Sequence, residues 1–228
     1  VSHLRFSPKP IAAPYLIDQA DFVACHQFPF IDKADMLKYV APGGTFLLNS
    51  SYGKGDVWDK LPRSVQEDLI DKDVNFYVID ANTVAASVGM GRRINTIMQT
   101  CYFAISGVLP QEEAIAQIKY AIKKTYGIKG QKIVDLNFAA VDAALEHLEK
   151  VDVPATVSAN RDRPALVPDH APEFVKAVTA KLLEGLGNDI PVSAFPVDGT
   201  WPTGTTKWEK RNIALDLPVW EQELCIQC

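Results

Sequence analysis

Thr45-Phe46-Leu47-Leu48-Asn49 is an apolar run that follows the turn residues Pro42-Gly43-Gly44, and it decides the fold class. Short apolar runs next to turn signals are typical of buried β-strands. Residues 21–25 and 75–79 have the same character. Helical spacing at residues 33–39 and 64–72, between these runs, predicts crossover helices that cover one face of a mainly parallel sheet.

Longer helical patterns follow the third run. They predict a helix over residues 92–107, another over 111–126 that ends at Gly127 and Gly130, and a last one that begins at Asn137. Alternation of strands and helices is typical of layered α/β domains. We therefore expect a three-layer α/β/α sandwich with a mainly parallel or mixed sheet.

The composition changes at residues 151–172, where prolines and polar residues replace the periodic pattern. This change indicates a connecting segment on the surface, followed by a helix over residues 172–186. We expect an α/β domain spanning residues 1–187 and an extended linker over 188–228 that contains Glu209-Lys210-Arg211.

Composition excludes several classes of function. The chain has 228 residues and a net charge of −5, and its basic residues form no stripe that would follow a nucleic acid. No apolar run reaches the roughly 20 residues that a membrane span needs. Cys25 and Cys101 lie alone in apolar sequence, which predicts buried free thiols in a reducing cytoplasm.

Cys225 and Cys228 form a Cys-x-x-Cys pair at the end of the sequence. This spacing suits an iron–sulfur cluster, a zinc ion or dithiol redox chemistry equally well. We therefore expect the chain to be an internal piece of a larger redox enzyme.

The stretch Gly89-Met90-Gly91-Arg92-Arg93-Ile94-Asn95 opens the helix predicted over residues 92–107. Glycines, a helix N-terminus and two guanidinium groups suit a phosphate. The same residues also fit a tight turn with both arginines facing solvent. Asn95 and Asn137 are either ligand contacts or polar groups that cap helices. The four histidines are dispersed and have no metal-ligand spacing, so we interpret each as structural or surface.

Seven stretches, in order along the chain, resemble the single-chain pyruvate:ferredoxin (flavodoxin) oxidoreductases. They are VSHLRF at 1–6, VACH at 23–26, FLLNS at 46–50, GRRINTIMQT at 91–100, IPVSA at 190–194, WEKRN at 208–212 and CIQC at 225–228.

This resemblance implies the middle, gamma-like domain of an enzyme that oxidatively decarboxylates pyruvate on thiamine diphosphate and magnesium. The acetyl group passes to coenzyme A, and electrons pass through 4Fe-4S clusters to ferredoxin or flavodoxin. Cys225 and Cys228 would be two ligands of one cluster, in a ferredoxin-like domain that continues past them. Partners would be the other domains of the same polypeptide, and the full-length enzyme would be a homodimer.

Carried over by motif, Asn95 and Asn137 would contact coenzyme A, with Arg92 meeting its phosphates. The family also uses a glycine-rich loop and a lysine upstream of Val1, so activity is not expected of this segment alone. Two alternatives stay open. One is a scaffold domain in which both asparagines cap helices. The other is the same domain of a related 2-oxoacid oxidoreductase.

Overall fold

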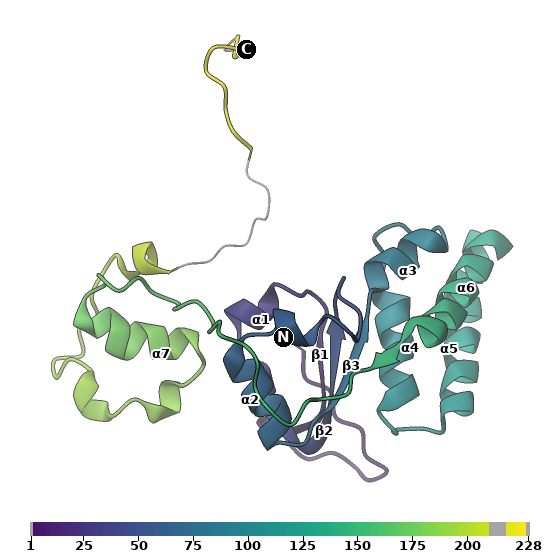
Figure 1. Cartoon of the computed structure of the whole chain (residues 1–228), viewed down its shortest axis with the longest axis horizontal. Helices are drawn as coiled ribbons and strands as arrows, with labels where there is room; N and C mark the ends of the chain where they lie inside the picture. Colours follow the sequence, from purple (N-terminus) through teal and green to yellow (C-terminus); the bar gives the residue numbers. More distant parts are fainter. Residues whose placement is uncertain (1, 210–217, 227–228) are drawn as a thin grey trace. The chain divides into compact units, whose positions relative to one another are not determined.

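The computed structural model describes residues 2–209 and 218–226 (Figure 1). The chain separates into two compact units, Val1–Pro164 and Ala165–Cys228. This division falls earlier in the sequence than the domain boundary that we expected after residue 187. Lys210 and Arg211 of the predicted Glu-Lys-Arg motif lie outside the described residues.

A four-stranded sheet forms the centre of the first unit. Its strands are β1 (Ala20–Cys25), β2 (Val40–Asn49), β3 (Asn75–Ile79) and β4 (Glu149–Lys150), and they lie side by side in that order. The first three are parallel, and β4 pairs antiparallel with β3. The three predicted strands are therefore confirmed. The fourth was missed because two residues leave no readable alternation.

Helices cover both faces of this sheet, which confirms the three-layer prediction (Figure 1). Successive side chains of a strand point to opposite faces. Phe46, Leu48 and Phe76 pack on one face with α2 (Arg63–Asp71). Leu47 and Ile79 pack on the other, with α3 (Ala81–Ser87), α4 (Asn95–Ile105) and α6 (Gln131–His147). The predicted helix over 111–126 is α5 (Gln111–Tyr126), which packs on α4 and α6.

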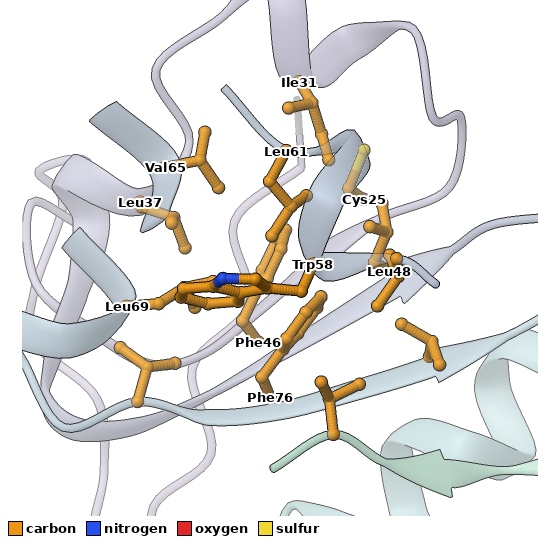
Figure 2. Close-up of a cluster of buried hydrophobic side chains, with 14 of the residues drawn as sticks. Cys25, Ile31, Leu37, Phe46, Leu48, Trp58, Leu61, Val65, Leu69 and Phe76 are labelled. Carbon is orange, nitrogen blue, oxygen red and sulfur yellow. The ribbon is translucent and has the colours of Figure 1, made fainter. Parts of the chain in front are cut away.

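The core on the α2 face is built around two stacked rings (Figure 2). The centroids of Phe46 and Phe76 are 5.6 Å apart, with an interplanar angle of 19°. Trp58, Leu61 and Leu69 close over them from the crossover between β2 and β3. This crossover is therefore anchored to the sheet by aromatic and aliphatic packing.

The helix predicted over residues 33–39 is wrong. The structure has a short α1 (Phe30–Lys33) and a 3₁₀ turn (Leu37–Tyr39), separated at Ala34, whose backbone is extended with φ −142° and ψ 138°. Ile31 and Leu37 are both buried in the same core. One continuous helix would direct them about 120° apart, so the break lets both reach the sheet.

Two helix starts were also placed wrongly. α4 begins at Asn95 rather than at residue 92, and α6 begins at Gln131 rather than at Asn137. A glycine with positive φ lies before each start. Gly91 has φ 63° and Gly130 has φ 99°, values that glycine adopts readily and that interrupt a helix. As a result, Asn137 lies in the interior of α6.

The connecting segment after β4 is tied firmly to the first unit. The Gln66 side chain on α2 accepts hydrogen bonds from the backbone N–H groups of Ser158 at 2.9 Å and Ala159 at 3.0 Å. It also donates to the carbonyl of Trp58 at 2.7 Å. We call residues 151–164 the strap. These bonds hold the strap against α2, and the first compact unit extends to Pro164.

The second unit has a small core of Val167, Ala171 and Val175. Its main helix includes a π-helical part (Val175–Thr179) followed by α7 (Ala180–Leu183), where the sequence predicts a helix over 172–186. Trp201 packs edge-on against Phe174, with ring centroids 5.0 Å apart. In the described part of the chain, no helix has the length and apolar character that crossing a membrane requires.

Candidate functional site

A polar hollow of about 740 Å³ lies in the first unit, where β1 and β3 end. Ligands of parallel α/β sheets commonly bind outside the carboxyl ends of the strands. One wall follows β1, a second belongs to α3, and the third is the turn that leads into α4. The lining residues are His26, Gln27, Asn82, Ala86, Gly91, Arg92, Ile94 and Asn95.

The turn before α4 begins as the C-cap of α3. Gly89 has φ 78°, and its N–H donates to the carbonyl of Ala86 at 3.1 Å. The Met90 N–H donates to the carbonyl of Ala85 at 2.8 Å, and the Met90 side chain is buried. Together these bonds form a Schellman motif, in which a glycine takes the left-handed position. The tight-turn interpretation is therefore correct for Gly89.

The two arginines after this turn differ in what they contact. The Arg93 guanidinium donates from Nε to the carbonyl of Met90 at 3.1 Å, which holds it on the turn. Arg92 is exposed and lines the hollow. None of the described residues that line the hollow is acidic. Its charge therefore suits an anionic group, and Arg92 is placed to meet it.

Asn95 is the first residue of α4, and its exposed side chain also lines the hollow. The N-cap of α4 is Ile94, and no side chain caps this helix by a hydrogen bond. Asn95 therefore does not have the capping role that the scaffold alternative requires. Its amide offers a donor and an acceptor beside the N–H groups that begin the helix.

Asn137 has a different environment, with only 4% of its surface exposed. Its Nδ2 donates to the carbonyl of Ile133 at 2.8 Å, and its Oδ1 accepts from the Thr96 hydroxyl at 3.0 Å. It caps no helix, because it lies within α6. The contact with Thr96 joins α6 to the first turn of α4, next to Asn95. Its direct contact with a ligand stays a prediction.

Sequence reasoning missed His26, Gln27 and Asn82 as residues of the hollow. A usable signal was present, since polar residues immediately follow two predicted strands in Cys25-His26-Gln27 and Ile79-Asp80-Ala81-Asn82. Such positions meet at one edge of a parallel sheet. The surrounding protein partly desolvates the His26 ring and lowers its pKa, so it is mainly neutral at pH 7.

The three cysteines that the structure describes lie in two environments. Burial raises the pKa of the Cys25 thiol to about 11 and that of Cys101 to about 12, which confirms the expectation of buried thiols. Cys225 is exposed, and Cys228 lies outside the described residues. No group of three or more metal-ligating side chains occurs within residues 2–209 and 218–226. The two buried thiols therefore stay protonated at neutral pH.

Thiol reactivity should follow this division. With iodoacetamide at pH 8, we expect Cys225 of the isolated 228-residue chain, without a cluster, to be alkylated within minutes, because only an accessible thiolate reacts. Cys25 and Cys101 should react at least about a hundredfold more slowly in the native chain, and should match Cys225 in urea. Peptide mass spectrometry resolves each site. Rapid native labelling of Cys101 would contradict the buried position of that thiol.

The family described as pyruvate ferredoxin/flavodoxin oxidoreductase matches residues 1–147. The chain belongs to this family. A second family, EKR, described as a domain of unknown function, matches residues 160–214. The two matches lie one after the other along the chain.

Relatives with 46–58% sequence identity agree with this assignment. The chain is 58% identical over 228 residues to the pyruvate-flavodoxin oxidoreductase of Rhodospirillum rubrum, covering all of this chain and 19% of that protein. It is 46% identical over 228 residues to the pyruvate:ferredoxin oxidoreductase of Moorella thermoacetica, covering all of this chain and 20% of that protein. The chain thus spans about a fifth of the length of these relatives. Among solved structures, pyruvate oxidoreductase subunit PORC of Thermotoga maritima matches with a TM-score of 0.48 and 18% identity, covering 60% of this chain and 67% of that one.

Proposed function

We propose that this chain is the coenzyme A-binding segment of an enzyme that oxidatively decarboxylates pyruvate and transfers the acetyl group to coenzyme A. Family membership supports the reaction, and the polar hollow beside α4 supports the part played by this segment. The observation that carries the proposal is the joint exposure of Arg92 and Asn95 on one wall of that hollow.

The chemistry of coenzyme A fits these groups. Its phosphates are anionic, and they suit the Arg92 guanidinium and the first N–H groups of α4. Its pantetheine arm carries amides, which pair with the Asn95 side chain as both donor and acceptor. Asn137 acts behind this wall, because its bond to Thr96 holds the first turn of α4 against α6. A direct contact of Asn137 with the ligand requires α4 and α6 to separate locally.

The remaining chemistry belongs to other parts of the polypeptide. Thiamine diphosphate with magnesium supplies the decarboxylation, and those parts hold both. Cys225 and Cys228 are two of the four thiolate ligands of a 4Fe-4S cluster that passes electrons onward, in preference to zinc or a redox dithiol. The acceptor is ferredoxin or flavodoxin, the enzyme is a cytoplasmic homodimer, and the partners of this segment are the neighbouring domains.

Titration calorimetry of coenzyme A against the full-length enzyme tests the proposal. We expect Asn95→Ala and Arg92→Ala each to weaken binding about tenfold, since each removes a polar contact worth about 1–2 kcal/mol. Asn188→Ala is the matched control, because Asn188 is an exposed asparagine in the second unit. Its affinity should equal that of the wild type. Unchanged affinity in both Asn95→Ala and Arg92→Ala would remove coenzyme A from this hollow.

The scaffold alternative loses its specific support in the structure. It assigns helix capping to Asn95 and Asn137, and neither residue caps a helix. A role in packing neighbouring domains is compatible with coenzyme A binding, but it does not explain an exposed arginine and an exposed asparagine that line one hollow.

A further inference from the structure

Asn49 is a buried amide behind the hollow. It ends β2, and only 3% of its surface is exposed. Its Nδ2 donates to the carbonyl of His26 at 3.0 Å, and its Oδ1 accepts from the N–H of Ala81 at 2.9 Å. One side chain thus bonds the segment that leaves β1 and the first residue of α3.

The topology explains why an amide is needed there. β2 lies between β1 and β3, and Asn49 pairs with Ile79, the last residue of β3. Beyond the strand ends, the ladder no longer satisfies the carbonyl of His26 or the N–H of Ala81. An asparagine side chain offers a donor and an acceptor at once, so it can satisfy both. A buried backbone group without a partner would cost stability.

Both bonded segments carry walls of the hollow. His26 and Gln27 line it from the β1 side, and Asn82, which follows Ala81, lines it from α3. None of these residues bonds directly to another strand through its side chain within the described part of the chain. Pairing of β1, β2 and β3 brings the strand ends together, and the two hydrogen bonds of Asn49 join the residues just beyond those ends to β2.

We infer that Asn49 is a positioning residue for the coenzyme A site, which holds the His26–Gln27 wall and the Asn82 wall at a fixed separation. The identity of the ligand in this inference rests on the proposed function. The two hydrogen bonds of Asn49 are observed independently of it. It adds the end of β2 to the site, although Asn49 itself does not line the hollow.

Asn49→Asp removes one of the two hydrogen bonds and keeps the other, with little change in the shape of the side chain. The variant keeps an acceptor for the Ala81 N–H, but it places a carboxylate oxygen against the carbonyl oxygen of His26. The repulsion should displace the β1-side wall and leave the hydrogen bond from the Ala81 N–H in place. Since small displacements in a binding site can cost large factors in rate or affinity, we expect coenzyme A to bind about tenfold more weakly.

Gln66→Glu is the matched control. Gln66 is an equally buried amide in the same unit, and its Nε2 donates to a backbone carbonyl, but it does not bond any segment of the hollow. The variant should therefore lose thermal stability as Asn49→Asp does. Coenzyme A affinity should stay within about twofold of the wild type in this control.

Two measurements on the full-length enzyme decide the inference. Titration calorimetry gives the affinity for coenzyme A, and hydrogen–deuterium exchange with mass spectrometry follows peptides from residues 26–29 and 80–86. We expect faster exchange in the peptide from residues 26–29 for Asn49→Asp, little change in the peptide from residues 80–86, and no change in either peptide for Gln66→Glu. Asn49→Ser provides the same test if Asn49→Asp does not fold, because the serine side chain is too short to make these hydrogen bonds and adds no charge.

The outcomes separate the two proposals. Unchanged exchange in both peptides would overturn the positioning role, whatever the ligand is. Equal losses of affinity in Asn49→Asp and Gln66→Glu would also overturn it, since general destabilisation would then explain both. If Asn95→Ala and Arg92→Ala weaken binding and Asn49→Asp does not, only the positioning inference fails. If exchange rises but coenzyme A binding never depends on Asn95 or Arg92, the proposed function fails and the positioning of the hollow stands.

Discussion

Phe46→Ala is expected to lower the free energy of unfolding of the first unit by about 3–5 kcal/mol, the largest effect of any substitution considered for this chain. Phe46 is 1% exposed at the centre of β2 and stacks on Phe76. Alanine removes the whole ring from a core that Trp58, Leu61 and Leu69 close (Figure 2). The surrounding rings cannot collapse fully into the space, so a cavity adds to the lost burial.

Urea unfolding followed by far-ultraviolet circular dichroism measures this loss. Tyr120→Ala is the control, because Tyr120 is an aromatic residue on α5 with 64% of its surface exposed. Its substitution should change the free energy of unfolding by less than about 0.5 kcal/mol. A Phe46→Ala loss as small as that of the control would mean that the stacked pair does not form the centre of the core.

The second large effect is expected at Gln66, where Gln66→Ala should cost about 2–4 kcal/mol and release the strap. Gln66 is 0% exposed. Its removal leaves the N–H groups of Ser158 and Ala159 without their partner, while the carbonyl of Trp58 still accepts from the Leu61 N–H at 3.2 Å. Each buried backbone group that loses its partner costs roughly 1–3 kcal/mol. Hydrogen bonds to water that form when the strap opens reduce this cost.

Ion pairs also hold the strap, but they are expected to stabilise it less than the hydrogen bonds of the Gln66 amide do. Arg161 pairs with Asp32 at 2.6 Å, with side chains 48% and 35% exposed. Arg163 pairs with Asp35 at 3.1 Å, and only the aspartate of that pair is more than a third exposed. Exposed pairs contribute roughly 0–1 kcal/mol, because solvent screens them and the side chains lose entropy. Gln66 should therefore control the strap more than Arg161 does.

Limited proteolysis together with urea unfolding tests this ranking. We expect cleavage within residues 151–164 to accelerate about tenfold or more in Gln66→Ala, since opening of the strap becomes easier. Gln117→Ala, on the exposed side of α5, is the matched control and should cleave at the wild-type rate. Faster cleavage in Arg161→Ala than in Gln66→Ala would reverse the assignment.

The candidate site was predicted in part. The glycine–arginine stretch and Asn95 were selected from the sequence, and the structure places Gly91, Arg92 and Asn95 on one hollow. The predicted helix starts misled the interpretation of Asn95 and Asn137. A polar amide near a predicted helix start suggests a cap, but α4 starts at Asn95 itself and α6 starts before Asn137. The backbone conformations that precede those starts cannot be read from residue type alone.

The missing wall of the site has a different cause. His26, Gln27 and Asn82 belong to segments that are more than 50 residues apart in the sequence, and only the parallel pairing of β1, β2 and β3 brings their strand ends together. Asn49 joins these segments through two backbone groups. Backbone bonds to a distant side chain leave no pattern of residue types, so periodicity could not indicate them.

The sequence by itself determined the layered α/β class, the three parallel strands and the burial of Cys25 and Cys101. Apolar runs and helical periodicity are local properties, and they are sufficient for those conclusions. Only the tertiary structure decided the break between α1 and the following 3₁₀ turn, the attachment of the strap through Gln66, and the walls of the hollow. Each of these depends on contacts between residues far apart in the chain, where the burial of a side chain or the need to satisfy a backbone group outweighs local preference.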